Sequence, residues 1–255
     1  AYNMQSKLLE GFIIPIAEYA RRWNGVIHPT FNQVGAVSGR LSCRDPNLQQ
    51  DPAYVRRHFV ARPGYTLIGA DYGQLELRIA AWLSDDVVMI KAFQDGADIH
   101  EHTRKLMGLP EGGEGRSKAK NAGFGVLYGA AFPKISETLG VSYDEARWLV
   151  ENYLASYPDL RRCIYETRAQ VRRTGVVYTA RGRPRWLPNA QGADLSRKAE
   201  AERQAFNHRI QGTAADLMKE IMLALERPLF AIGARMLLQI HDELVVEAPL
   251  GAVDV

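Results

Sequence analysis

The sequence predicts an α+β fold in which a small antiparallel sheet carries a large helical insertion. Residues 65–70 are a continuous apolar run bounded by Pro63 and Gly64, which is typical of a buried strand. Apolar runs at 236–240 and 244–247 flank residues 241–243 and predict a hairpin. Helical periodicity dominates from about 86 to 165, between these two groups of strands. We therefore expect the first strand and the distant hairpin to share one sheet.

The other segments complete a coarse outline. Residues 7–22 have a helical pattern that Gly11 and Pro15 interrupt, and residues 25–60 combine turn residues with short apolar patches. Three further elements are expected: a helix that follows Asp71, a hairpin at 176–187 with a basic turn, and a long helix at 195–225 interrupted near Gln211.

Composition excludes several classes of protein. A chain of 255 residues with 46% hydrophobic residues can bury a core, and its net charge of +3 permits nucleic acid as a partner without requiring it. Cys43 and Cys163 belong to no closely spaced pair, which argues against a disulfide scaffold or a zinc ribbon and favours a reducing compartment. No run approaches the roughly 18 apolar residues of a membrane span, and no export signal is visible. We therefore expect no membrane partner and no secretion.

Two acidic positions lie at the edges of the predicted strands. Asp71 follows the run at 65–70, and Asp242 lies in the turn of the distant hairpin. Two converging carboxylates repel each other unless cations neutralise them, and Mg²⁺ prefers such hard oxygen ligands. A pair of ions roughly 3.5–4 Å apart would activate an attacking oxygen and stabilise a leaving one. The alternative is that Asp71 is a turn or N-cap residue before the helix near Gln74, and that Asp242 is an acid of the hairpin turn. Taken one at a time, each fits that simpler role better.

A stripe of cations and aromatic rings follows the glycine-rich segment near Gly115. Arg116, Lys120, Phe124 and Tyr128 recur every four residues, so they share one face of a helix. The cations are suited to a triphosphate and the rings to stacking on a base or sugar. The alternative is a solvated charged turn that leads into a buried aromatic pair.

A cluster of arginines between residues 161 and 185 suits contact with a phosphate backbone. The part between Arg161 and Arg173 fits a solvated helix face equally well. Arg181, Arg183 and Arg185 lie in the turn of the predicted hairpin and are the better candidates for DNA contact.

Together these segments resemble a known family. Residues 71–78, the stripe from Arg116 to Gly129 and residues 241–243 are similar to motifs A, B and C of family A DNA polymerases, the bacterial DNA polymerase I type. Residues 39–42, 46–49, 98–100 and 211–219 match further family segments in the expected order. The resemblance covers nearly the whole chain.

The resemblance implies a right-hand polymerase fold with the thumb mostly absent. Residues 1–22 would end the thumb or form a linker, and residues 23–85 would be the first part of the palm with motif A. Residues 86–165 would be the fingers with motif B. Residues 166–255 would return from the fingers and form the second part of the palm with motif C, without its C-terminal end. Gly73 and Gly123 depart from the serine and asparagine usual at these positions, and a glycine inside the helix at 123 should loosen it by roughly 0.5–1 kcal/mol.

The resemblance also implies the roles of the reacting groups. Asp71, Asp242 and the Tyr72 carbonyl would hold two catalytic Mg²⁺ ions, with Glu243 beside them near the primer terminus. Lys120 would hold the triphosphate and donate to the leaving pyrophosphate.

Further residues would bind the incoming nucleotide. Arg116 would hold the triphosphate together with Lys120, assisted by His100 and Gln74. Phe124 would pack on the sugar and base, and Tyr128 would occupy the template-base position in the open site. Glu76 would crowd the sugar 2′ position and exclude ribonucleotides.

The remaining implied role is contact with primer-template DNA, and several of these contacts would be in the minor groove. Hydrogen-bond acceptors lie similarly there in every base pair, so contacts can test the geometry of a pair without reading its sequence. These residues are Arg40, Asn47, Gln49, Arg203, Asn207, Gln211 and His241, to which the turn residues Arg181 and Arg183 are added.

The implied function is DNA-directed DNA polymerase, a nucleotidyltransferase of replication and repair that adds deoxynucleotides to a primer 3′ end and releases pyrophosphate. Its partners would be primer-template DNA and dNTP, and it would act as a monomer in the cytoplasm of a bacterial or phage-infected cell, or in an organelle. Two alternatives stay open: a single-subunit RNA polymerase and a non-catalytic DNA-binding remnant. Glu76 and Glu243 argue against the RNA polymerase.

Overall fold

The computed structural model describes residues 9–252 and divides the chain into two compact units. One, called here the sheet unit, comprises Ala1–Gly73 and Ala215–Val255. The other, called the helical unit, comprises Gln74–Ala214. Within the described residues, no helix is both long and apolar enough to cross a membrane.

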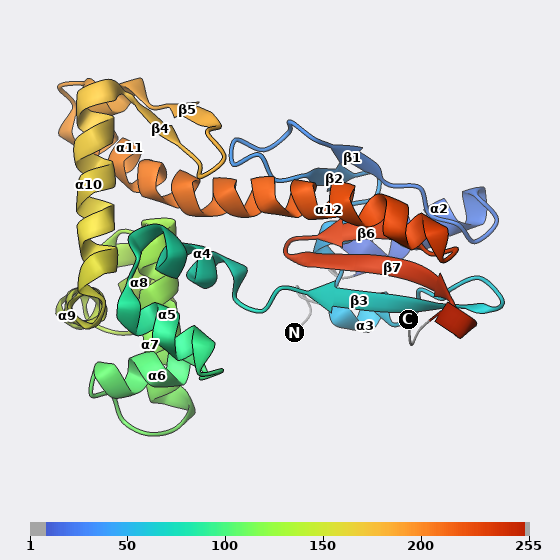
Figure 1. Cartoon of the computed structure of the whole chain (residues 1–255), viewed down its shortest axis with the longest axis horizontal. Coiled ribbons are helices and arrows are strands. Elements are labelled where there is room, and N and C mark those ends of the chain that lie inside the picture. The colour runs from blue at the N-terminus through green and yellow to red at the C-terminus, as the bar shows by residue number, and fades with distance from the viewer. Residues whose placement is uncertain (1–8, 253–255) are drawn as a thin grey trace. The chain divides into compact units, whose positions relative to one another are not determined.

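The sheet unit is built on three antiparallel strands in the order β3-β7-β6 (Figure 1). These are β3 (Tyr65–Asp71), β6 (Arg235–Ile240) and β7 (Glu243–Pro249). The predicted strand, the predicted hairpin and their common sheet are thus confirmed. The expected burial of β3 was wrong, because its side chains are half-buried or exposed. The physical reason is that β3 is an edge strand, paired with β7 alone in the described part of the chain.

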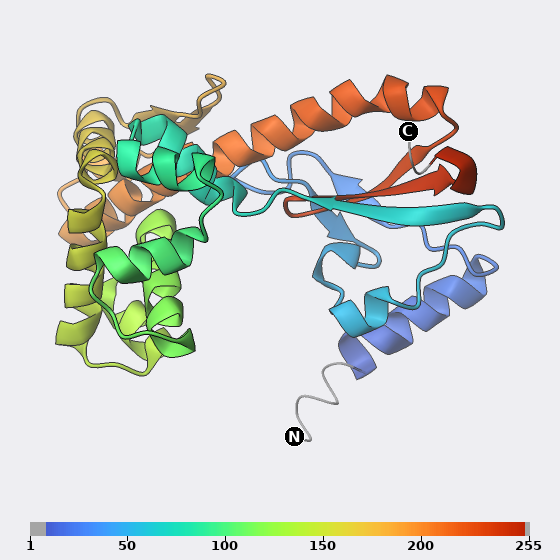
Figure 2. The ribbon, with the colours of Figure 1, turned by 60° about the horizontal axis from the view of Figure 1, so that its bottom comes forward.

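Helix α12 (Thr213–Ala231) runs along this sheet (Figures 1 and 2). Leu229 near its end packs against a small core of Ala234, Val246 and Ala248. Residues 25–60 form short elements, as expected. They are β1 (Thr30–Asn32), β2 (Ser42–Arg44), η2 (Leu48–Gln50) and α3 (Ala53–Arg56). A further short element, η5 (Leu250–Ala252), follows β7.

The N-terminal helical segment is not interrupted as predicted. A π-helical turn, η1 (Leu9–Ile13), leads directly into α2 (Ile14–Arg22). Pro15 lies in the first turn of α2, a position at which proline is common. Residues 7 and 8 of the predicted segment lie outside the described residues.

The helical unit confirms the predicted insertion, the hairpin and the interrupted long helix. Its helices before the hairpin are α4 (Leu75–Ser84), α5 (Val87–Gln94), α6 (Ile99–Leu106), α7 (Gly113–Tyr128), α8 (Phe132–Leu139), α9 (Tyr143–Ser156) and α10 (Pro158–Thr174). They are followed by β4 (Val176–Tyr178), β5 (Pro184–Trp186), η3 (Pro188–Gln191), α11 (Leu195–Asn207) and the π-helical segment η4 (His208–Gly212).

The core of the helical unit is formed where these helices cross. Leu127 of α7, Tyr153 of α9 and Tyr157 are almost fully buried, and the two tyrosine rings meet edge to face with centroids 5.2 Å apart. A second core cluster joins α10, the β4–β5 hairpin and α11 through Val171, Val177 and Ala205. This packing fixes the face of α7 that carries the predicted stripe.

Candidate functional site

Strand pairing brings the two predicted metal-binding acids, Asp71 and Asp242, to the same end of the sheet. This end is called here the acidic edge. Asp71 is the last residue of β3 and lies opposite Glu243, the first residue of β7. One residue further, the Tyr72 N–H donates to the Asp242 carbonyl over 3.1 Å. Asp71 is therefore a strand residue, and the cap position of α4 belongs to Gln74, so the capping alternative for Asp71 was wrong.

The two carboxylates repel each other. The pKa of Asp242 lies above its ordinary value, chiefly because the group is buried and also because the negative charge of Asp71 acts on it. Arg40 and His241 act in the opposite direction without cancelling this effect. An arrangement of this kind is one that a divalent cation would relieve.

The donor set suits a hard cation held partly by water and substrate. Among the described residues, no three His, Cys, Asp or Glu side chains form a metal-binding group. Asp71 and Asp242 with the Tyr72 carbonyl would supply two carboxylates and one backbone oxygen. Mg²⁺ is usually bound in this way, through one or two carboxylates plus substrate phosphates.

Glu243 is already engaged by another residue. Its carboxylate accepts a hydrogen bond from Arg56 over 2.9 Å and lies over Gly69, where a Cβ would come within 2.8 Å of Oε1. Gly69 thus makes room for this side chain on β3. Arg56 also donates to the Asp51 carbonyl over 3.0 Å, so Glu243 is held beside the two aspartates by the end of α3.

The predicted stripe lies along α7 with the spacing expected. The Lys120 ammonium lies 5.6 Å from the centre of the Phe124 ring, and Phe124 stacks on Tyr128 with centroids 5.7 Å apart. Lys120 and Tyr128 are exposed and Phe124 is half-buried, while Leu127 on the other face of α7 is fully buried. The alternative of a buried aromatic pair is therefore wrong.

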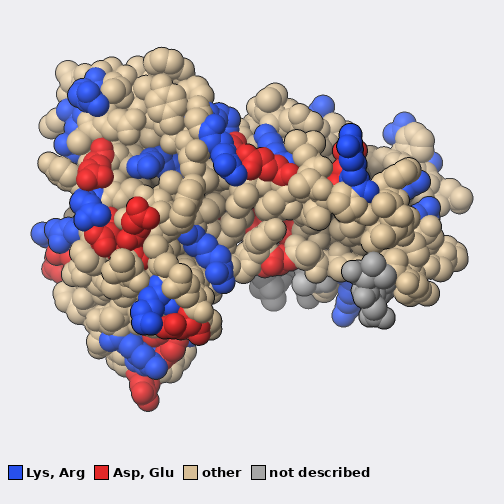
Figure 3. All heavy atoms as spheres, in the orientation of Figure 1, with Lys and Arg blue, Asp and Glu red and all other residues tan. Residues whose placement is uncertain are grey.

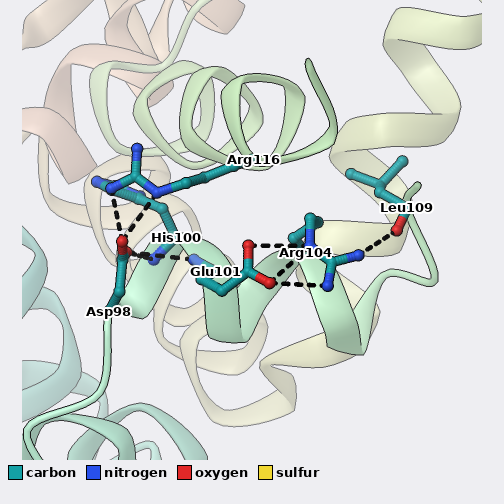
Figure 4. A network of polar contacts seen from close by, with 6 residues as sticks. All are labelled: Asp98, His100, Glu101, Arg104, Leu109 and Arg116. Atoms are coloured by element: carbon teal, nitrogen blue, oxygen red, sulfur yellow. Dashed lines mark hydrogen bonds and ion pairs between the residues drawn. The ribbon is translucent and has the colours of Figure 1, made fainter. Parts of the chain in front are cut away.

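Helix α6 completes this face. His100 is buried, and its ring meets Phe124 edge to face with centroids 5.8 Å apart. Burial, reinforced by the charges of Arg116 and Lys120, lowers the pKa of His100 below its ordinary value. Arg116 is bound by Asp98, at the start of α6 (Figure 4).

The start of α4 carries the other two residues predicted at the nucleotide. Glu76 lies in the first turn of α4 and is 5% exposed. Gln74 is half-buried and takes a left-handed backbone conformation with φ of 60°. This residue is the N-cap of α4.

The predicted DNA-contacting residues of the sheet unit gather around the hairpin. Gln49 is buried and donates to the carbonyl and side-chain oxygens of Gln239 on β6, over 3.0 and 2.9 Å. Gln239 in turn donates to the carbonyl of His241, which is exposed in the turn. Asn47 caps η2, and Arg40 acts electrostatically on Asp242. These contacts connect Gln49, a predicted DNA-contacting residue, with the turn that contains His241 and Asp242.

The predicted DNA-contacting residues of the helical unit lie on α11, η4 and the β4–β5 hairpin. Arg203 is half-buried, and its Cβ lies 2.7 Å from where a Cβ on Gly129 would be, so α11 packs against the end of α7. Asn207 ends α11, and Gln211 lies within η4.

Within the hairpin the arginines differ. Arg181 is exposed in the turn, whereas Arg183 donates to the Gly212 carbonyl over 3.0 Å and Arg185 to Gln204 over 2.9 Å. Arg183 and Arg185 therefore hold the hairpin to the segment that follows it. On the face drawn in Figure 3, basic side chains of the helical unit are interspersed with acidic ones.

Two residues at this site were missed by sequence reasoning. Asp98 had a local signal, because an acid followed three positions later by Glu101 is a helix-start pattern. Arg56 had none, since its partner Glu243 is distant in sequence. The sheet unit thus holds the acidic group and the helical unit holds the stripe.

Comparison with known proteins identifies the family of this chain. The family model for DNA polymerase family A matches residues 1–255. The chain is 44% identical to DNA polymerase I of Deinococcus radiodurans over 254 residues, which is 96% of this chain and 27% of that protein. It is 45% identical to the thermostable DNA polymerase I of Thermus thermophilus over 258 residues, 97% of this chain and 31% of that protein. The chain therefore spans less than a third of the length of these relatives.

A solved structure gives the same result for the fold. The chain superposes on the POL domain of Pol1 from M. smegmatis, described in complex with DNA primer-template and dNTP, with a TM-score of 0.87 and 34% identity. The match covers 96% of this chain and 45% of that one. The α+β architecture is thus that of a right-hand polymerase domain, and this chain belongs to DNA polymerase family A.

Proposed function

We propose that this protein is a DNA-directed DNA polymerase, which transfers a deoxynucleoside monophosphate to a primer 3′-hydroxyl and releases pyrophosphate. The observation that carries the proposal is the pairing of β3 with β7, which places Asp71 beside Asp242 in a chain of this family. Phosphoryl transfer needs positioning and charge stabilisation and no covalent nucleophile, which this group of residues can supply.

Asp71, Asp242 and the Tyr72 carbonyl would hold two Mg²⁺ ions. When bound, these ions would activate the primer hydroxyl and neutralise charge on the phosphates. Glu243, held by Arg56, would lie near the primer terminus.

The stripe on α7 would receive the incoming dNTP. Arg116 and Lys120 would bind its phosphates, and Lys120 would donate a proton to the leaving pyrophosphate. Phe124 would pack on the sugar and base, with Tyr128 in the template-base position. His100, which lies against Phe124 on this face, would donate a hydrogen bond to the triphosphate.

The remaining assignments follow the family. Gln74 would assist at the nucleotide, and Glu76 would crowd the sugar 2′ position. Residues 1–22 would end the thumb or form a linker, residues 23–85 would be the first part of the palm, and residues 86–165 the fingers. Residues 166–255 would return from the fingers and form the second part of the palm. The nine predicted DNA contacts would bind primer-template in the minor groove and along the backbone.

The test is primer extension by the full-length gene product with Mg²⁺ and dNTPs. Asp71→Ala and Asp242→Ala are each expected to reduce kcat by about 10³-fold or more, because removing an ion-holding carboxylate removes charge stabilisation in the transition state. Binding of primer-template, measured by fluorescence anisotropy, should change little. Extension that is unchanged in both variants would overturn the metal assignment, and wild-type protein that binds DNA without extending it would point to a DNA-binding remnant.

A further inference from the structure

Asp98 has a carboxylate whose two oxygens serve two different elements (Figure 4). Oδ1 accepts from the backbone N–H groups of His100 and Glu101, over 2.9 and 3.2 Å, and thereby caps the start of α6. Oδ2 accepts from Nε of Arg116 on α7 over 2.8 Å and forms an ion pair with one Nη of the same guanidinium at 2.7 Å. One side chain therefore fixes both the helix start that carries His100 and the guanidinium of Arg116.

One turn later, Arg104 of α6 fixes the loop that leads from α6 to α7. Arg104 of α6 is buried, pairs with Glu101 and donates to the Leu109 carbonyl over 2.6 Å. The loop that follows packs tightly on α7, since a Cβ on Gly115 would lie 2.0 Å from the Pro110 carbonyl oxygen. Because the backbone of α7 is already fixed by this contact, the Asp98 contact acts mainly on the orientation of the Arg116 side chain.

Asp98 leaves part of the Arg116 guanidinium available. In the described residues, the second Nη of Arg116 has no hydrogen-bond partner, and the side chain is 42% exposed. A guanidinium held along one edge can present its other N–H groups to two oxygens of one phosphate. The carboxylate thus orients the cation and leaves an anion-binding edge open.

We propose that Asp98 is a positioning residue for the triphosphate: it aims Arg116 and His100 at the same ligand. The inference rests on the proposed function, because it concerns the nucleotide of that reaction. An ion pair exposed to this extent adds little stability, so the contribution of Asp98 is to orientation.

The variant Asp98→Asn separates the two tasks of the side chain. Asparagine caps a helix about as well as aspartate, so α6 keeps its start, whereas the charge that binds Arg116 is lost. In primer extension by the full-length gene product, we expect the KM for dNTP to rise about tenfold, with kcat and primer-template binding within about twofold of wild type. The melting temperature should be unchanged.

A double-mutant cycle with Arg116→Ala tests whether the effect passes through Arg116. If it does, Asp98→Asn should add no more than about twofold to the KM of the Arg116→Ala variant, since coupled residues are not additive. Asp194→Asn is the matched control. Asp194 caps α11 with the same two kinds of backbone bond, over 2.9 and 3.1 Å, and lies near Arg197 at 3.6 Å, but α11 starts away from α6 and α7 in the sequence. The KM of the Asp194→Asn variant for dNTP should equal that of wild type.

Other outcomes are distinguishable. An active wild type whose KM is unchanged in Asp98→Asn overturns this inference and leaves the proposed function intact. Additive effects in the double variant, or a lowered melting temperature with the same loss, assign Asp98 a structural role and also overturn it. An inactive wild type overturns the proposed function itself.

Discussion

Glu76 is the residue on which the choice of sugar is expected to depend. Its side chain is 5% exposed in the first turn of α4, so it has little freedom to yield to a bulkier ligand. Glu76→Ala should improve use of rNTP relative to dNTP by about tenfold or more, because removing the side chain opens space at the 2′ position. The ratio of kcat/KM for the two substrates measures this.

Glu76→Gln is the control for that experiment. Glutamine keeps the volume of the side chain, so discrimination against rNTP should remain. A wild type that uses rNTP as readily as dNTP would contradict the prediction and favour the RNA polymerase alternative.

At the scale of elements, the packing of α7 on α9 shows why Gly123 lies inside a helix. A Cβ at Gly123 would lie 2.9 Å from Cε2 of Tyr153, which is buried. The sequence suggested only a loosened helix at this position. In the structure, the Tyr153 ring occupies the space that a side chain at position 123 would need. Gly123 therefore allows α7 and α9 to approach each other closely.

Gly123→Ala is therefore expected to destabilise the protein by about 1–3 kcal/mol through overpacking, although alanine is the better helix former. Chemical denaturation monitored by circular dichroism would measure the change. Gly113→Ala is the matched control in the same helix: no atom lies within 4 Å of its added Cβ, so its stability should be unchanged or slightly raised. Equal stability of both variants would contradict the packing argument.

At the scale of the whole molecule, the acidic edge of the sheet links thermal stability to magnesium. Asp71 and Asp242 are far apart in the chain, and folding brings their charges together at a cost that a bound cation would offset. Mg²⁺ should raise the melting temperature of wild type, with about 1.4 kcal/mol of stabilisation at tenfold excess over its Kd.

Asp71→Asn and Asp242→Asn should be insensitive to Mg²⁺ in the same thermal scan and more stable than wild type without it, because each removes the repulsion. Asp194→Asn, which changes a residue of the helical unit, should respond as wild type does. Mg²⁺ stabilisation that persists in both asparagine variants would contradict binding at this edge.

The secondary structure of most of the chain, and the identity of its chemical groups, could be predicted from the amino-acid sequence. Periodicity is local, so the β6–β7 hairpin, the helical insertion and the stripe on α7 could all be predicted from neighbouring residues. Local pattern gave wrong predictions where tertiary surroundings determine the outcome. β3 has the apolar run of a buried strand yet is an edge strand. Pro15 lies in the first turn of α2, where it does not break the helix.

Only the tertiary structure decided how distant residues act together. Asp71 and Asp242 each fit a simple turn role in the sequence, and the β3–β7 register turned them into one acidic group. The Arg56–Glu243 pair, the Asp98–Arg116 pair and the Gly123–Tyr153 contact likewise join residues from separate elements. The physical reason is that electrostatic and packing energies depend on distance in space, which local pattern does not encode.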